Sequence, residues 1–431
     1  MASLRSALLP FARVSLRTRH AQLPSLPPSL GLMRGYKSRG PARDPMTGEM
    51  IALPDIDPSL LKLEPTSSPK IRPPSSTLIF GRTFTDHMLT IRWSSNSGWQ
   101  APVIGPYRPL ELDPSSTVLH YAFTAFEGMK AYRNEDGTVR LFRPDMNMAR
   151  LNRSAARAAL PTFDPKALET LIKKLVMLDS EWIPNEPGYS LYIRPTLIGT
   201  QNALGVGPNS DALLFVICSP VGPYYASGYK PVQLLATKKY VRAWPGGTGS
   251  HKLGVNYGPG IVPQSEAAKE GYSQNLWLFG EDDALTEVGT MNLFVAFKKP
   301  DGGVELATPP LGDLVLPGVT RDSVLALARG HIKGEKIPGL PDNLTVTERK
   351  VVMGELEEAE KNGTLSEVFG TGTAAVISVV DRIGYNGRDI TIPTGPRGLG
   401  PIAESLLSRV TDIQTGKIEH EWSIVANDVR L

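Results

Sequence analysis

Hydrophobic residues recur along this chain at the two spacings that distinguish strands from helices. Continuous or alternating apolar runs predict strands. These runs occupy 77–93 (a strand pair), 117–134 (a strand or helix edge), 138–144, 189–200, 211–220, 232–244, 274–280 and 292–299. Apolar residues three and four apart predict helices. The predicted helices occupy 145–161, 164–184, 260–272 and 320–330, with a charged, solvated helix over 355–363.

Strands and helices are mixed in both halves of the chain, which predicts a mixed α/β (α+β) fold. At 431 residues, the chain is long enough for two domains. Gly, Pro and Ser cluster at 223–230, where we expect an interdomain loop. We therefore expect a smaller α/β domain over 77–222 and a larger domain over 231–431. The Pro-rich segment 37–76 is expected to be an extended lead-in rather than a packed element.

The first 43 residues carry eight basic side chains and no acidic one. The segment is also rich in Ser and is amphipathic as far as about residue 19 if helical, which is typical of a mitochondrial targeting peptide. We expect residues 1–36 to be that peptide, cleaved after Tyr36, and the protein to reside in the mitochondrial matrix. The alternative is a disordered basic tail.

Charge and composition exclude several other classes. Subtracting the eight leader cations from the 46 Lys and Arg leaves 38 basic against 43 acidic side chains, so we expect no nucleic-acid partner. No apolar run approaches the roughly 20 residues of a membrane-spanning helix. The single cysteine, Cys218, cannot form a disulfide within the chain and is expected to be a buried strand residue. The six histidines show no metal-ligand spacing, so no metal site is predicted.

The segment "GGTGSHKLGVNYGP", residues 246–259, places Lys252 in a glycine-rich loop between apolar segments. A lysine that acts through its neutral amine needs apolar walls or neighbouring cations, and Leu253, Val255 and Tyr257 follow it closely. The alternative is a solvated turn lysine. A carboxylate, Glu287 in "LTEVGTMNLF", follows an apolar strand and could pair with a protonated ring nitrogen, or lie in solvent or in a structural salt bridge.

Two turns in the second half could hold an anion. In "VLPGVTRDSVLALA" (315–328), a Pro-Gly turn leads into a helix, so the backbone amides of Val319 and Thr320 would point outward at its N-terminus. Ordinary N-capping by Thr320 is the alternative. "FGTGTAAV" (369–376) is a glycine–threonine turn that matches neither the P-loop nor the dinucleotide fingerprint. An amine, a carboxylate and two anion-binding turns are together what pyridoxal phosphate requires.

These segments, with "FGRTFTDHML", "LHYAFTAFEGMKAYR", "LFRPDMNMARLNRSA" and "LYIRPTLIGT", resemble in order those of the branched-chain amino acid aminotransferases, from about 78 to 428. The resemblance implies a two-domain, fold-type IV enzyme dependent on pyridoxal 5'-phosphate, with the cofactor between the domains and a site at a homodimer interface. It implies ping-pong transfer of the amino group from leucine, isoleucine or valine to 2-oxoglutarate, with branched 2-oxo acids and glutamate as products.

The same resemblance assigns the cofactor residues. It implies that Lys252 forms the internal aldimine and shuttles the proton, and that Glu287 pairs with the pyridine nitrogen. Tyr257 would bind the cofactor's phenolate oxygen, and Arg150 its phosphate. The remaining implied phosphate contacts are Val319, Thr320, Thr290 and Thr373.

The substrate pocket is also implied by the resemblance. Its implied lining residues are Phe80, Tyr121, Phe126, Tyr192, Ala374 and, from the interdomain loop, Tyr224. The α-carboxylate would meet the amides of Thr373 and Ala374 and the Tyr121 hydroxyl, and Arg194 would engage the γ-carboxylate of glutamate. A structural salt bridge of Arg194, and a core role for the aromatic residues, are the alternatives.

One departure from the family pattern has a chemical consequence. Mammalian members carry a C-x-x-C pair just after the turn, where this chain has Ala375 and Ser378, so no thiol switch can form there. Two other readings are a D-amino acid aminotransferase or aminodeoxychorismate lyase of the same fold, and a non-catalytic protein that binds pyridoxal phosphate or another phosphate ligand. The leader, "YIRP" and "FEGMKAYR" disfavour the former. Intact Lys252, Glu287 and Arg150 disfavour the latter.

Overall fold

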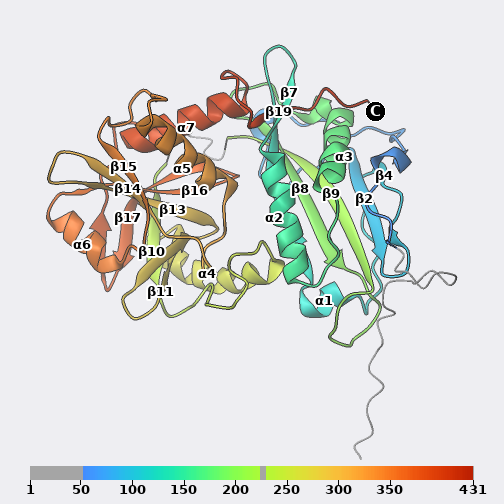
Figure 1. Cartoon of the computed structure of the whole chain (residues 1–431), viewed down its shortest axis with the longest axis horizontal. Coiled ribbons are helices and arrows are strands. Elements are labelled where there is room, and N and C mark those ends of the chain that lie inside the picture. The colour runs from blue at the N-terminus through green and yellow to red at the C-terminus, as the bar shows by residue number, and fades with distance from the viewer. Residues whose placement is uncertain (1–51, 224–229, 431) are drawn as a thin grey trace, which may run out of the picture. The chain divides into compact units, whose positions relative to one another are not determined.

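A computed structural model describes residues 52–223 and 230–430. Within these ranges the strands form a 10-stranded and a 9-stranded sheet with helices packed against them, so the predicted mixed α/β fold is confirmed (Figure 1). The predicted targeting segment, and Tyr224 with most of the predicted interdomain loop, lie outside the described residues.

The first sheet is built mainly from the first half of the chain. Its strands are β1 (Lys62–Leu63), β2 (His87–Ser94), β3 (Gly98–Trp99), β4 (Val103–Pro106), β5 (Thr124–Phe126), β6 (Met129–Arg133), β7 (Val139–Phe142), β8 (Ser190–Gly199), β9 (Asp211–Val221) and β19 (Ser423–Val425). The main path runs β1-β4-β2-β9-β8-β6-β7-β19, with β3 beside β2 and β5 beside β8. The last strand, β19, comes from the C-terminal end of the chain and pairs antiparallel with β7 (Figure 1).

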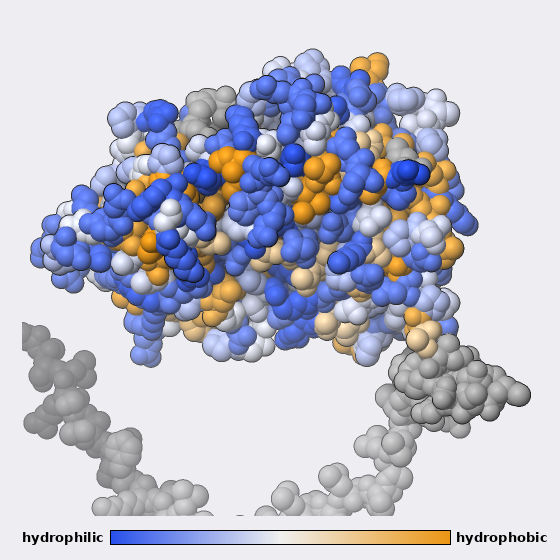
Figure 2. Space-filling model, turned by 45° about the horizontal axis from the view of Figure 1, so that its top comes forward, coloured by the Kyte–Doolittle hydropathy of each residue, from blue (hydrophilic) through white to orange (hydrophobic). Residues whose placement is uncertain are grey.

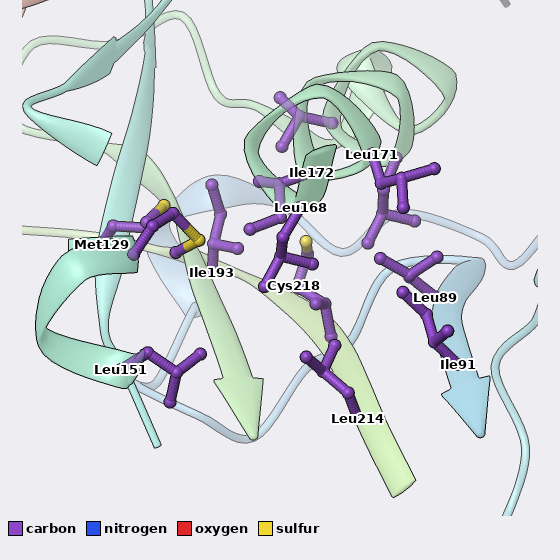
Figure 3. Packing of buried hydrophobic residues seen from close by; sticks show 14 of the residues in the cluster. Leu89, Ile91, Met129, Leu151, Leu168, Leu171, Ile172, Ile193, Leu214 and Cys218 are labelled. Carbon is purple, nitrogen blue, oxygen red and sulfur yellow. The ribbon is translucent and has the colours of Figure 1, made fainter. Parts of the chain in front are cut away.

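Helices α1 (Thr117–Tyr121), α2 (Pro144–Arg157) and α3 (Pro165–Leu178) accompany this sheet. Asp164 caps α3 by accepting a hydrogen bond from the Lys166 backbone N–H, and Pro165 has the φ that a first helical turn needs. The predicted apolar face of α3 is buried against the sheet, where Leu168, Leu171 and Ile172 meet the apolar residues of β2, β6, β8 and β9 (Figure 3). Cys218 is fully buried in β9 within this cluster, as predicted.

The second sheet comes entirely from the second half. Its strands are β10 (Val232–Thr237), β11 (Gln274–Phe279), β12 (Ala284–Val288), β13 (Met291–Lys298), β14 (Val304–Thr308), β15 (Leu344–Glu348), β16 (Leu365–Gly372), β17 (Val376–Tyr385) and β18 (Arg388–Thr391). Its helices are α4 (Ile261–Lys269), α5 (Val319–Ile332), α6 (Met353–Lys361) and α7 (Pro401–Gln414). Segment 366–380 is a strand–turn–strand unit, in which β16 pairs antiparallel with β17.

Three expectations from the sequence differ from the structure. Residues 78–86 are not the first strand of a pair, because Gly81 turns the backbone at φ +69° and only β2 forms. The strand predicted over 232–244 ends at Thr237, and the loop that follows brings Arg242 into contact with Glu287. Segment 52–76 is partly packed rather than merely extended: Ile56 is buried and β1 pairs with β4.

The surface in Figure 2 shows hydrophobic residues as separate patches among hydrophilic ones. None of the helices in the described part of the chain combines the length and the apolar character that crossing a membrane requires.

A buried carboxylate joins the second sheet to α7. Glu367 in β16 is 2% exposed and accepts hydrogen bonds from the backbone N–H groups of Ile402 (2.9 Å) and Ala403 (3.0 Å) in the first turn of α7. The helix has no side-chain cap of its own, since its N-cap is Gly400. Glu367 therefore provides the negative charge that a helix N-terminus favours.

We expect Glu367→Ala to lower the free energy of unfolding by about 2 kcal/mol, because two helix N–H groups lose a buried charged acceptor. Denaturant unfolding measures this change. Glu404→Ala is the matched control, since Glu404 lies in the same helical turn but pairs with an exposed Arg397; we expect it to cost about 0.5 kcal/mol. Equal losses for the two variants would contradict the capping role of Glu367.

Candidate active site

The loop that carries Lys252 is fixed from both halves of the chain. The backbone N–H of Lys252 donates to the Ser154 hydroxyl of α2 (2.9 Å), and the Lys252 carbonyl accepts from the N–H of Phe126 (3.1 Å). Glycine is required at position 249, where a Cβ would lie 2.3 Å from the Cβ of Ala243 and 2.6 Å from the carbonyl oxygen of Asp313. The glycine-rich sequence therefore allows the close approach that brings Lys252 to its position.

The Lys252 amine is surrounded by aromatic groups. Its Nζ donates a hydrogen bond to the Tyr257 hydroxyl at 3.1 Å and lies 4.9 Å from the centroid of the Phe126 ring. The rings of Phe126 and Tyr257 meet edge to face at 4.9 Å. The structure thus brings together three of the predicted site residues, with Lys252 half-buried rather than a freely solvated turn lysine.

Glu287 is buried at the end of β12, with only 2% of its surface exposed. Its carboxylate accepts from Arg242 (2.8 Å), the Leu316 backbone N–H (2.8 Å) and the side-chain amide of Asn292 (3.1 Å). Burial raises the pKa of Glu287 above its ordinary value, although the charge of Arg242 opposes that shift. Of the two alternatives for Glu287, exposure to solvent is therefore wrong, whereas the structural salt bridge is present, to Arg242.

Arg150 projects from α2 into a second buried cluster. Its Nε and Nη2 bind the two carboxylate oxygens of Glu127 at 2.7 and 2.8 Å, and its Nη1 donates to the Pro317 carbonyl at 2.9 Å. The side-chain amide of Asn147 also donates to Glu127 (2.7 Å). Burial alone would raise the pKa of Glu127, but Arg150 and Asn147 hold that pKa below its ordinary value.

Sequence reasoning missed two of these residues, Glu127 and Arg242. Glu127 lies in "AFEGMK", where an acid between apolar residues of a predicted strand is the kind of position that requires a buried partner. Arg242 lies in the segment read as a continuing strand. Because β10 ends at Thr237, the loop that follows brings Arg242 to Glu287, a contact that no local sequence pattern indicates.

The turn before α5 presents backbone amides without a side-chain cap. The N-cap is Gly318, and no side chain caps the helix, so N-capping by Thr320 is wrong. Val319 and Thr320 are the first helical residues, as predicted. Pro317, one residue before the cap, binds Arg150. A cationic guanidinium beside uncapped helix amides fits the phosphate of a cofactor.

A buried hydroxyl lies near the same turn. Thr371 in β16 is 1% exposed, and its hydroxyl has no hydrogen-bond partner in the described part of the chain. Strand alternation puts it on the same face as Phe369, which packs with the apolar residues of α5. An orphaned donor in this position also fits an anion that the protein alone does not supply.

The remaining predicted cofactor residues are less closely grouped. The Thr373 hydroxyl donates to the Gly128 carbonyl at 3.2 Å, which puts it beside β6. Thr290 is exposed after β12 and lines a cavity of about 110 Å³ together with Arg242 and Tyr257. It makes no hydrogen bond with Arg150 or with the first turn of α5 in the described residues.

The predicted substrate residues form a chain of contacts that leads away from Lys252. Arg194 lies 4.9 Å from the Phe126 ring centroid and donates to the Tyr192 hydroxyl at 3.0 Å. Tyr192 in turn meets Phe80 edge to face at 4.9 Å. Arg194 thus stacks on aromatic rings instead of forming the alternative structural salt bridge, and Phe80 is 44% exposed instead of lying in the core.

Two other predicted substrate residues, Tyr121 and Ala374, form hydrogen bonds within the chain. Tyr121 is 39% exposed, and its hydroxyl donates to the Leu204 carbonyl rather than pointing freely toward a ligand. Ala374 follows Thr373 in the turn, and its carbonyl accepts a hydrogen bond from Lys130 at 2.7 Å.

The sequence model of the amino-transferase class IV family matches residues 124–383. That range contains Glu127, Arg150, Lys252 and Glu287, so the match includes both buried clusters and the lysine.

Two relatives from Saccharomyces cerevisiae are similar over most of the chain. Its cytosolic branched-chain-amino-acid aminotransferase is 50% identical over 382 residues, which is 88% of this chain and 100% of that protein. Its mitochondrial counterpart is 50% identical over 377 residues, which is 87% of this chain and 94% of that protein. Among solved structures, the T.th branched-chain amino acid aminotransferase complexed with N-(5'-phosphopyridoxyl)-L-glutamate is 26% identical, with a TM-score of 0.59 over 78% of this chain and 98% of that one.

We expect Glu127→Ala to lower the free energy of unfolding by about 3–5 kcal/mol, because it leaves the Arg150 guanidinium buried without its partner. Glu127→Gln retains the shape and should cost less. Because the pKa of Glu127 is held below its ordinary value of 4.5, its stabilising contribution is present above that pH and is lost as the pH falls through the lowered pKa.

Urea unfolding of the parent and both variants, at neutral pH and in acid, measures these differences. The gap between the parent and Glu127→Gln should narrow as Glu127 becomes protonated. A gap that stays constant down to acid pH would contradict an ionised, paired Glu127.

Proposed function

The chain belongs to the class IV aminotransferases, and we propose that it catalyses reversible transfer of the amino group from L-leucine, L-isoleucine or L-valine to 2-oxoglutarate. The observation that carries the proposal is the position of the Lys252 amine. It lies 3.1 Å from the Tyr257 hydroxyl, and its charge acts on the carboxylates of both buried pairs, Arg150–Glu127 and Arg242–Glu287. The branched-chain aminotransferases named above, half identical to this chain, support the substrate class.

We infer that pyridoxal 5'-phosphate is the cofactor. When bound, it supplies an aldehyde and a ring that accepts the electron pair released at the substrate Cα. Arg150, the amides of Val319 and Thr320, and Thr373 would hold the phosphate. Glu287 would hold the proton on the ring nitrogen, and its raised pKa suits a carboxylate that shares a proton.

The chain's own groups would perform the proton transfers. Lys252 would hold the cofactor's aldehyde. Once free, its amine would remove the proton from the substrate Cα and deliver it to the cofactor. Tyr257, which already accepts a hydrogen bond from Lys252 Nζ, would orient that amine and bind the ring's hydroxyl oxygen. Phe126 would exclude water from the same amine.

We propose that the side chain of the amino acid lies against Phe80, Phe126 and Tyr192, and that Arg194 binds the second carboxylate of glutamate. Arg194 Nε is buried without a hydrogen-bond partner in the described part of the chain, which leaves a charged donor for such a ligand. The combination would let one site accept an apolar and an acidic side chain.

A homodimer is part of the proposal. Several large apolar residues near the proposed pocket are exposed, namely Leu119 (58%), Tyr121 (39%), Leu204 (65%) and Val206 (76%). A second copy of the chain covering them would also enclose the site.

We further propose a mitochondrial location, supported by the Arg- and Ser-rich, acid-free leader. The similar proteins include both cytosolic and mitochondrial forms. Residues 1–36 fused to a fluorescent protein should direct it to mitochondria. The same fusion with its arginines replaced by glutamine should stay in the cytosol. Identical distributions of the two fusions would contradict this address.

The central test is transamination by the protein without residues 1–36, with L-leucine and 2-oxoglutarate, beside Lys252→Ala. The parent should form glutamate and absorb near the visible edge. The variant should lose roughly 1,000-fold or more of the rate, because it lacks the amine that moves the proton.

Lys252→Arg retains the positive charge without a usable neutral amine and should be equally inactive. A coloured parent that transaminates D-amino acids or releases a lyase product instead would replace the substrate assignment. A parent that binds the cofactor without turnover would indicate a binding protein.

A further inference from the structure

A second lysine, Lys130 in β6, lies beside the candidate site. Only 8% of it is exposed, and burial lowers its pKa to about 8. In the part of the chain that the structure describes, its ammonium forms no salt bridge. Lysine is rarely buried without a charged partner, so this position needs an explanation.

Strand pairing turns Lys130 toward the proposed substrate pocket. In the antiparallel pairing of β6 with β8, Lys130 lies directly opposite Tyr192, so the two side chains share one face of the sheet. Gly128, two residues earlier, has room for no side chain, because a Cβ would lie 2.0 Å from the Tyr192 hydroxyl oxygen. Lys130 therefore lies on the same face of the sheet as Tyr192 and a second cation, Arg194, which stacks on the Tyr192 ring.

Lys130 and Gly128 hold the turn between β16 and β17 at two points. Lys130 Nζ donates to the Ala374 carbonyl at 2.7 Å, and the Thr373 hydroxyl donates to the Gly128 carbonyl at 3.2 Å. These bonds join segments that are more than two hundred residues apart in the sequence, so local turn geometry does not determine the position of the turn.

The turn also contains an unfavourable backbone conformation. Val376 has φ +61°, in the left-handed region that a β-branched residue rarely adopts. Such a conformation persists only where surrounding contacts hold it. The Ile377 N–H spans Val376 by donating to the Ala375 carbonyl at 2.7 Å, and the Lys130–Ala374 bond ties the residue just before this tight turn to β6.

We propose that Lys130 is a positioning residue for the substrate's α-carboxylate. By holding the Ala374 carbonyl, it keeps the backbone N–H groups of Thr373 and Ala374 directed at that carboxylate, and its charge favours an anion there. The inference rests on the proposed function. Because the amino acid and the 2-oxo acid both carry an α-carboxylate, Lys130 acts on both halves of the reaction.

The test compares two ligands of the holoenzyme by titration calorimetry, 4-methylvalerate and its neutral amide, which share a carbon skeleton and differ in charge and in the NH2 group that replaces one oxygen. In Lys130→Met, the acid should bind about tenfold more weakly or worse, whereas the amide should change by less than about twofold. Lys130→Arg retains a charged donor and should recover part of the affinity for the acid. KM for leucine and for 2-oxoglutarate should both rise in Lys130→Met, with a smaller change in kcat.

Lys173→Met is the matched control. Lys173 is equally buried at 8% exposure, but it lies in α3 and pairs with Glu169 and Asp428. It should leave the preference for acid over amide unchanged. Equal weakening of acid and amide in Lys130→Met, or the same loss in Lys173→Met, would overturn the positioning role. If the parent protein binds neither ligand, the proposed substrate class is wrong and this inference fails with it. If the parent binds the acid, any difference in Lys130→Met reports on the role of Lys130 alone.

Discussion

The buried guanidinium of Arg150 is the interaction on which the candidate site depends. One edge of it binds both oxygens of Glu127, and its remaining nitrogen binds the Pro317 carbonyl just before α5. This buried charge is tolerated because the carboxylate of Glu127 pairs with it, and the loss of either partner would leave the other buried and unpaired. The contact ties α2 of the first half to the uncapped helix turn of the second, so the proposed phosphate site would draw on both halves.

Lys252 is held in the same way by residues distant in sequence. Its loop follows the second sheet's first strand, but its backbone is bonded to Ser154 and Phe126 of the first half. The charge of Lys252 acts on two buried carboxylates, Glu127 and Glu287, whose pKa values shift in opposite directions. Glu127, with a bidentate partner, stays ionised, while burial favours the protonated form of Glu287. One carboxylate thus fixes a cation, and the other is suited to share a proton with a bound ring.

Much of this arrangement could be predicted because it has a local signal. The apolar face of α3, the strand around Cys218 and the helix start at Val319 follow from spacing and turn chemistry. Local sequence also indicates Lys252 and Glu287, because a lysine among glycines and an acid directly after an apolar strand are positions where a charged side chain needs a polar partner. Their roles toward the cofactor remain proposals.

Glu127, Arg242 and Lys130 were not predicted, because their importance depends on what faces them. Lys130 alternates with apolar residues in an ordinary strand pattern, and only pairing with β8 and contact with Ala374 make it exceptional. Arg242 lies in a segment whose apolar pattern predicts a strand, but the strand ends at Thr237. Long-range contacts of this kind leave no periodicity in the sequence.

The most direct measurement of the central claim is to reduce the holoenzyme with borohydride and to find the phosphopyridoxyl group by peptide mass spectrometry. Two buried or half-buried lysines, Lys252 and Lys130, lie near the proposed cofactor site, so the measurement has a built-in comparison. The account predicts the group on the peptide containing Lys252 and none on the peptide containing Lys130. A label on Lys130, or on a lysine elsewhere in the chain, would contradict it.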